Sequence, residues 1–252
     1  MVNFVSSNSI VRKIWGKGDT ILFIFAGAAA EFALNRAVDW LYFTGKLPAD
    51  PLGRLFSTVS YARHIVFSEN EEALKAIDRI AAIHSAVEHS RNSKIPDWAY
   101  RDVLFMLIYY SISAFEVMER KLTLHEKEEV FEVFYRVGAR MGLQDLPHNY
   151  SEWLTARQLH LHNNLANSTY TADLFNQYKK HLGVVRYTIM LEGQKLVVPG
   201  EVKILLGFGK QSLIKPVLGL YKLTRYFKID WLLKAVILPS AYKKEISELD
   251  MT

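Results

Sequence analysis

Arg54, Thr58 and His84 lie in two neighbouring apolar stretches and are the residues of this sequence whose types and spacing could do chemistry. Arg54 and Thr58 are four residues apart, so a helix would place them on one face, which Tyr61 or Ala62 and then Ile65 continue. A guanidinium, a hydroxyl and an imidazole turned toward an apolar interior are the groups that a buried haem or metal site for dioxygen would need.

His84 belongs to a stretch in which apolar residues recur at steps of three and four. The helical period predicts an inward stripe formed by Leu74, Ile77, Ala81, His84 and Val87. The same period turns four charged residues toward water, namely Glu71, Lys75, Asp78 and Arg79. The sequence therefore predicts that the histidine points inward.

Each of these residues also has a purely structural interpretation. A histidine on an apolar face is commonly a hydrogen-bonded core residue, and periodicity alone favours that interpretation for His84. Arg54 could reach solvent from the helix start, and Thr58 could bond a carbonyl of its own helix. An inward Arg54, by contrast, calls for an anion, either a carboxylate or the propionate of a cofactor.

The elements that must position these residues are helices. The dominant period of the chain is helical, and the alternating runs at residues 186–191 and 195–198 are short exceptions. Asp19 and Thr20 are expected to precede one helix, and Thr123 with Glu126 predicts a capping box. The sequence predicts an all-α protein.

The longest predicted helix runs from Asp97 to Arg120, with Pro96 at its first turn. Its middle is apolar nearly all round, which is typical of a helix that neighbours bury on every side. We expect it to be the central helix of the fold. Turns are expected where Pro, Gly and Asn gather, at residues 46–50, 90–95, 142–149 and 199–200.

The composition of the 252 residues, half of them apolar, indicates one helical domain over 1–252. Cysteine is absent, which excludes disulfides, thiolate metal sites and a cysteine nucleophile. The longest apolar run, ILFIFAGAAAEFAL, is interrupted by Glu31 and falls short of the roughly 20 residues of a membrane span. It also lacks the pattern of a signal peptide, so we expect a cytoplasmic protein, peripheral at the membrane at most.

The formal charge of +5 is concentrated toward the chain ends. Residues 200–252 are expected to form basic, apolar C-terminal helices in which cations alternate with Leu, Ile, Val and aromatic residues. Such a surface suits anionic lipid, and a solvated basic face on ordinary packed helices is the alternative. Nucleic acid is not expected, since no binding motif accompanies the charge.

The other histidines and glycines are weaker candidates. His160 and His162 are two residues apart, so a helix sends them to different faces and a shared metal would require another backbone shape. His125 is expected to be exposed, and His89 is the fallback ligand if His84 is not one. Residues 207–210, Gly-Phe-Gly-Lys, lack the strand and spacing of a phosphate-binding loop.

The run DPLGRLFSTVSYARHIVFSENEEALKAIDRIAAIHSAVEH resembles the MpaB and latex clearing protein (rubber oxygenase) catalytic-domain family. Shared features are Asp-Pro, Gly-Arg, a threonine four residues after the arginine, and a helix ending in an inward histidine. The similarity continues through the long helix and RVGARMGLQDLPHNYSEW. It extends from about residue 30 to 240 and is strongest before residue 155.

The resemblance implies an all-α haem b protein with a globin-like haem pocket, which uses dioxygen to cleave or oxygenate a double bond of an apolar isoprenoid or lipid-like substrate. It implies that His84 is the haem iron ligand, with its second ring nitrogen oriented by a neighbouring acceptor. It also implies that Arg54 and Thr58 hold a haem propionate or polarise oxygen as catalytic groups.

The chain departs from the rubber-cleaving members at three places. Ser57 stands where a lysine can cap the iron, Asn35-Arg36 replaces a usual His-Pro, and the nearest acids for an upstream catalytic glutamate are Glu31 and Asp39. Cleavage of a polymer and oxidation of a smaller isoprenoid are therefore both compatible with the sequence. A noncatalytic helical module that binds lipid or a partner is the alternative function.

Overall fold

The computed structural model describes residues 2–43, 45, 49–209 and 211–226. Within these ranges the regular structure is helical, and the two β-type pairings are isolated bridges. The all-α prediction is confirmed there, and the alternating runs at 186–191 and 195–198 belong to the end of a helix, with Val198 as its C-cap. The helices are α1 (Ile10–Trp15), α2 (Gly18–Phe32), α3 (Asp39–Phe43), α5 (Pro51–Phe67), α6 (Asn70–Arg91), α7 (Asp97–Met118), α8 (Leu124–Arg140), α9 (Tyr150–Asn163), α10 (Thr169–Val197), α11 (Gly200–Leu205) and α12 (Lys215–Tyr226).

The helix boundaries follow the capping chemistry of the sequence. The Thr123 side chain accepts from the backbone of Glu126, and the Glu126 carboxylate accepts from the backbone of Thr123, which confirms the capping box. Pro96 is the N-cap of α7 rather than a residue of its first turn. Asp19 lies within the first turn of α2 instead of preceding it, where its charge complements the helix dipole. The turns expected at residues 90–95, 142–149 and 199–200 all separate helices.

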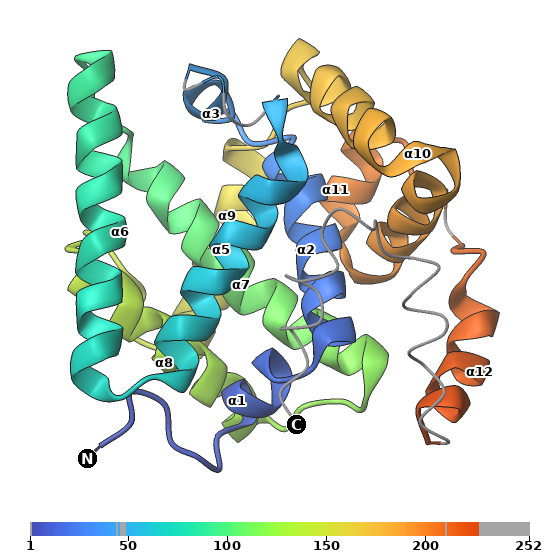
Figure 1. Cartoon of the computed structure of the whole chain (residues 1–252), viewed down its shortest axis with the longest axis horizontal. Helices are drawn as coiled ribbons and strands as arrows, with labels where there is room; N and C mark the ends of the chain where they lie inside the picture. Colours follow the sequence, from blue (N-terminus) through green and yellow to red (C-terminus); the bar gives the residue numbers. More distant parts are fainter. Residues whose placement is uncertain (1, 44, 46–48, 210, 227–252) are drawn as a thin grey trace.

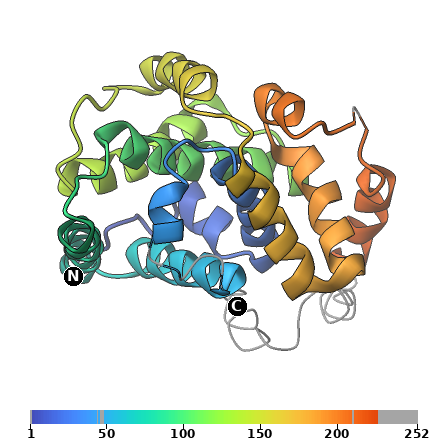
Figure 2. The same ribbon diagram turned by 90° about the horizontal axis from the view of Figure 1, so that it is seen from above.

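α7 is the central helix that the sequence predicts. It packs against α1, α2, α8, α9 and α10. Phe105, Ile108 and Tyr110 on its middle turns are all fully buried, because neighbouring helices cover several of its faces. α2 lies along α7 and is covered in turn by α10, as Figures 1 and 2 show.

The close approach of α2 to α7 depends on Gly27. A Cβ atom at this position would lie 2.2 Å from two ring carbons of Tyr110, which is fully buried and cannot move aside. We expect Gly27→Ala to lower the free energy of unfolding by about 1–3 kcal/mol, because an overfilled core must shift its side chains or backbone. Chemical denaturation measures the loss.

Gly193 in α10 is the matched control for that substitution. It is also a buried helical glycine, but its added Cβ would meet Phe23 at 3.6 Å, an ordinary contact distance. Gly193→Ala should therefore leave stability unchanged or raise it through the better helix propensity of alanine. An equal loss in both variants would contradict the steric explanation for Gly27.

A buried polar network joins α2, α7 and α9. The Glu31 carboxylate on α2 accepts both terminal nitrogens of Arg157 on α9 and, at 2.8 Å, the hydroxyl of Tyr110 on α7. Burial and the neighbouring carboxylate raise the pKa of Tyr110, which therefore stays a hydrogen-bond donor. Each group thus has a partner that offsets the cost of removing it from water.

A second buried carboxylate lies near the end of α2. Asp102 on α7 accepts from the Asn35 amide at 2.7 Å and from the Asn164 amide at 3.1 Å, and it also contacts the ring of His160. These contacts fix the chain just after α2 and just after α9. The two networks explain why polar residues interrupt otherwise apolar stretches of α2 and α7.

α5 and α6 are antiparallel neighbours joined by a short turn at Ser68 and Glu69. The N-terminal segment holds this turn, because the backbone of Phe4 donates to Ser68, that of Asn70 donates to Val2, and Asn3 bridges Glu69. Away from the turn the two helices splay apart, and α7 passes behind them (Figures 1 and 2).

No helix in the described part of the chain has the length and apolar character needed to cross a membrane. The predicted basic C-terminal helices are described only as far as Tyr226, where α12 ends. The remainder of that prediction, residues 227–252, lies outside the described residues.

Candidate active site

The start of α5 explains the Asp-Pro and Gly-Arg pairs of the sequence. Asp50 is the N-cap and accepts from the backbone of Gly53 at 2.9 Å, and Pro51 occupies the first turn, where its missing N–H costs nothing. A Cβ at position 53 would lie 2.1 Å from the capping carboxylate, so the cap requires glycine there. Arg54 follows on the first turn of α5, and its side chain is not among the described ones.

The buried face of α5 is formed by Val59, Ala62 and Ile65. By the helical period Thr58 lies on the same side of α5 as Ala62 and Ile65, yet its side chain is exposed. The prediction that Thr58 faces the packed interior is therefore wrong. Its catalytic role stays a prediction.

α6 carries His84 on the face that the sequence predicts. On the predicted stripe Ile77 is buried. His84 is half-buried, and so are Leu74, Ala81 and Val87. The opposite face is exposed, as expected for Glu71, Lys75, Asp78 and Arg79. The inward orientation of His84 is confirmed.

Arg54 and His84 lie at matching heights on the two helices. Arg54 precedes the turn residue Ser68 by 14 positions, and His84 follows Glu69 by 15. At 1.5 Å per residue both are about 20 Å from the turn, in the part of the pair where α5 and α6 have splayed apart (Figure 1). The turn of α5 that carries Arg54 and the turn of α6 that carries His84 therefore lie at the same end of the helix pair.

Tyr100 on α7 supports the ring of His84. The two rings meet edge to face with centroids 5.2 Å apart. The Tyr100 hydroxyl donates to Glu88 at 3.0 Å, and Glu88 also accepts from the backbone of Ile95 at 2.9 Å. Burial, together with the Glu88 carboxylate, raises the pKa of Tyr100 and keeps the phenol protonated. Glu88 thus fixes a neutral aromatic ring against the histidine.

We expect Tyr100→Phe to keep the ring contact with His84 and to lower the free energy of unfolding by about 1 kcal/mol, because the bond to Glu88 is lost. Thermal unfolding checks the value. Tyr135→Phe is the matched control, since Tyr135 is half-buried and its hydroxyl donates no hydrogen bond within the described residues. Equal effects of the two substitutions would contradict the importance of the Glu88 bond.

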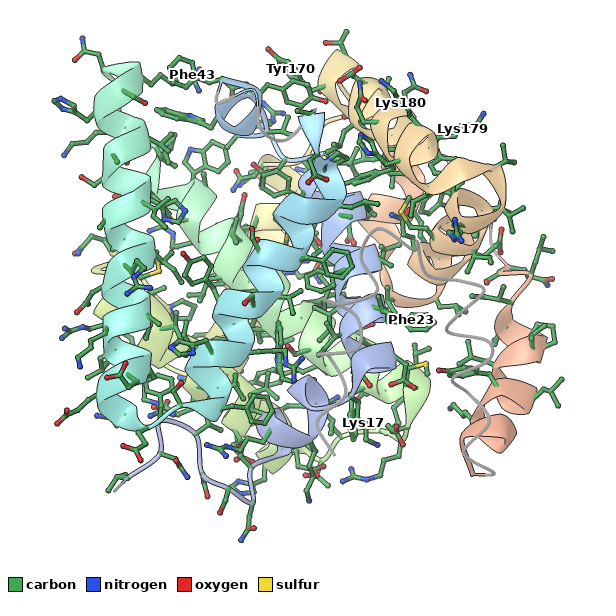
Figure 3. The ribbon with its side chains drawn as sticks, in the orientation of Figure 1. Lys17, Phe23, Phe43, Tyr170, Lys179 and Lys180 are labelled. Atoms are coloured by element: carbon green, nitrogen blue, oxygen red, sulfur yellow. The ribbon has the colours of Figure 1, made fainter. Side chains whose placement is uncertain are left out.

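A second cation, Arg91, lies on the same face of α6 two turns beyond His84. It donates to Asp39 of α3 at 2.8 Å, and its guanidinium lies 4.0 Å from the ring centroid of Trp40 and 5.2 Å from that of Phe43. Phe43 is labelled in Figure 3. Its Nη1 atom is buried and has no hydrogen-bond partner within the described residues. A buried N–H of this kind suits an anionic oxygen.

Glu31 and Asp39, the acids nearest to the position expected for a catalytic glutamate, have different surroundings. Glu31 is 1% exposed and is occupied by Arg157 and Tyr110, so it is a structural group. Asp39 pairs with Arg91 at the end of α6 that carries His84. Asn35, which replaces the histidine of the usual His-Pro pair, bonds Asp102 and the backbone of Ala37 and is likewise structural.

The remaining histidines do not form a metal site. His160 is half-buried against Phe105 and Asp102, whereas His162 is exposed on another side of α9, as the spacing predicts. His89 on α6 is exposed. Within the described ranges, no group of three or more His, Asp or Glu residues could hold a metal ion. Of the two histidines on α6, His84 lies on the inward face and His89 on the exposed one.

Sequence reasoning missed Tyr100, Glu88 and Arg91. Glu88 and Arg91 follow His84 by four and seven residues, so the helical period alone could have placed them on its face. Tyr100 reaches His84 only through the packing of α7 on α6, and no local pattern signals that contact.

A comparison with family models matches residues 13–220 to the catalytic domain of the ER-bound oxygenase mpaB/B′ and rubber oxygenase family. The match spans α2 to α11 and includes the α5–α6 pair with Arg54, Thr58 and His84. No curated protein and no solved structure matches the chain.

Proposed function

Because the chain belongs to the ER-bound oxygenase mpaB and rubber oxygenase family, we propose that it is a haem b-dependent oxygenase of apolar isoprenoid or lipid-like alkenes. Membership in the family implies an oxygenase. The proposal adds the cofactor, the substrate class and the residues. It is supported above all by the inward, half-buried imidazole of His84 at the splayed end of α5 and α6.

The residues at this end of the molecule fit a haem. His84 offers a ring nitrogen from a half-buried position, and Tyr100 restrains the ring from the side. Arg91 offers a buried N–H without a partner in the described residues, which suits a propionate as well as the expected Arg54 does. A neutral imidazole is one of the axial ligands that hold haem iron, and guanidinium groups suit the negative charge of its propionates.

Haem, when bound, supplies redox-active iron for the activation of dioxygen. The net reaction proposed is cleavage of one carbon–carbon double bond by one dioxygen molecule, so that each carbon receives one oxygen atom as a carbonyl. His84 would hold the haem iron through a ring nitrogen of its neutral form. The contact with Tyr100 restrains the plane of the imidazole ring. Arg54 and Thr58 are proposed to hold anionic or polar oxygen atoms on the α5 side.

The proposed apolar substrate class comes from the family to which the chain belongs. Val59, Ala62, Ile65 and Ile77 belong to the packed core between the site and the turn that joins α5 and α6. Ser57 cannot act as the lysine cap of rubber-cleaving members, because a hydroxyl on a short side chain lacks both the reach and the basic nitrogen of lysine. The proposed substrate class therefore includes a smaller isoprenoid or lipid-like alkene as well as a polymer.

Haem titration of the purified full chain tests the cofactor. We expect a Soret band that saturates at one haem per chain. Incubation of the loaded protein with squalene and dioxygen should then give products with aldehyde or ketone ends, detected as hydrazones. No Soret band after haem addition would overturn the haem proposal and leave the noncatalytic helical module. A Soret band without carbonyl products would overturn the substrate class alone.

A further inference from the structure

A cleft of about 450 Å³ lies between the end of α10, α11 and α12. Four lysines line it, namely Lys195, Lys203, Lys215 and Lys222. Val117, Leu196 and Leu218 supply apolar lining. α12 and α6 lie on opposite sides of the molecule, so this cleft is separate from the His84 site (Figure 1).

The lysines reach the cleft from three helices. Lys195 is near the end of α10 and Lys203 is in α11. On α12 the lining residues are Lys215, Leu218, Gly219 and Lys222, which follow the helical steps of one face. Lys215 and Lys222 therefore lie on the same face of α12, with Leu218 between them. The lysines lie within one stretch of the sequence, and the packing of three helices brings them to one cleft with Val117 of α7.

The positive charge of the cleft is only partly compensated. Glu192 pairs with Lys195 at 2.5 Å and accepts from the backbone of Leu213 at 2.6 Å. Burial opposes ionisation of Glu192, yet these two hydrogen bonds hold its pKa below the usual value, so it is a carboxylate. Lys203, Lys215 and Lys222 form no ion pair within the described residues. Three ammonium groups at one cleft repel one another unless an anion joins them.

We propose that this cleft binds a ligand that carries a phosphate group, with the phosphate among the lysines and the organic part against Val117, Leu196 and Leu218. A phosphate monoester carries close to two negative charges and three acceptor oxygens, which matches several ammonium donors. A carboxylate would offset only one of the three unmatched charges. The volume suits a small organic molecule or the headgroup region of a lipid.

Titration calorimetry with inorganic pyrophosphate tests whether the cleft binds a phosphate compound that is free in solution. Sedimentation with phosphatidylcholine vesicles, with and without phosphatidic acid, tests the lipid form. In whichever assay the wild-type chain binds, the double substitution Lys203→Gln with Lys222→Gln should weaken binding at least about tenfold, because two charge-assisted contacts are lost.

Lys179→Gln with Lys180→Gln is the matched control. Both residues are exposed on α10 and labelled in Figure 3, they do not line the cleft, and the pair changes net charge equally. Circular dichroism checks that both variants are folded. Pyrophosphate binding that only the cleft variant loses identifies a soluble ligand, and vesicle binding with the same pattern identifies a lipid headgroup. Equal losses in both variants, or no binding in either assay, would overturn the proposal.

Discussion

Replacing His84 by alanine is expected to abolish the Soret band of the haem-loaded protein and, with it, the oxidation of the alkene. The imidazole is the proposed iron ligand, and within the described residues no second histidine lies on the inward face of α6. Because the ring is only half-buried, its removal should leave the fold intact. Haem titration and circular dichroism of the variant measure the two effects separately.

Two further measurements make the His84 experiment decisive. Added imidazole should restore part of the Soret band of His84→Ala, because the small molecule can occupy the space of the lost side chain and supply the same nitrogen. His89→Ala, on the exposed face of the same helix, should bind haem as the wild type does. A full Soret band in His84→Ala would assign the ligand elsewhere, and its loss in His89→Ala alone would assign it to His89.

Replacing Arg157 by methionine is expected to lower the free energy of unfolding by about 3–5 kcal/mol, because the Glu31 carboxylate would remain buried without its counter-ion. Among the described residues, the Tyr110 hydroxyl alone would still donate to that carboxylate. Replacing Glu31 by methionine as well should recover part of the loss, since an apolar pair removes the uncompensated charge. Equilibrium denaturation of the single and double variants measures both values.

Arg140→Met is the matched control for Arg157→Met. Arg140 also binds a carboxylate through two nitrogens, that of Asp78, but this pair is exposed at the surface. Water can replace the lost partner there, so little change in stability is expected. A comparable loss in both variants would show that burial of Glu31 is not what makes its ion pair important.

Local patterns predict those features of this fold that arise within one element. The capping box at Thr123, the central helix α7 and the inward position of His84 depend on neighbouring residues of one helix, and the structure confirms all three. The apolar stripe of α6 is sufficient for the last of these because one face of that helix is buried and the other is not.

Features that depend on the packing of distant elements were not predictable. Thr58 shares a face of α5 with the buried Ala62 and Ile65, yet it is exposed, because the surroundings of α5 differ along its length. Glu31 interrupts an apolar stretch, and its partner Arg157 lies 126 residues away in the chain. A local stretch of sequence cannot contain both members of such a pair. The sequence therefore shows a carboxylate in an apolar stretch but not the arginine that neutralises it.

The anchored turn between α5 and α6 acts as a fixed pivot. The N-terminal segment holds Ser68 and Asn70 by backbone bonds, so bending of the pair moves the far ends most. At a lever arm of about 20 Å, a relative rotation of about 5° would displace His84 from the Arg54 turn by about 2 Å. A small change in the angle between α5 and α6 would therefore change the separation of the Arg54 turn and His84 while the turn at Ser68 and Glu69 keeps its contacts.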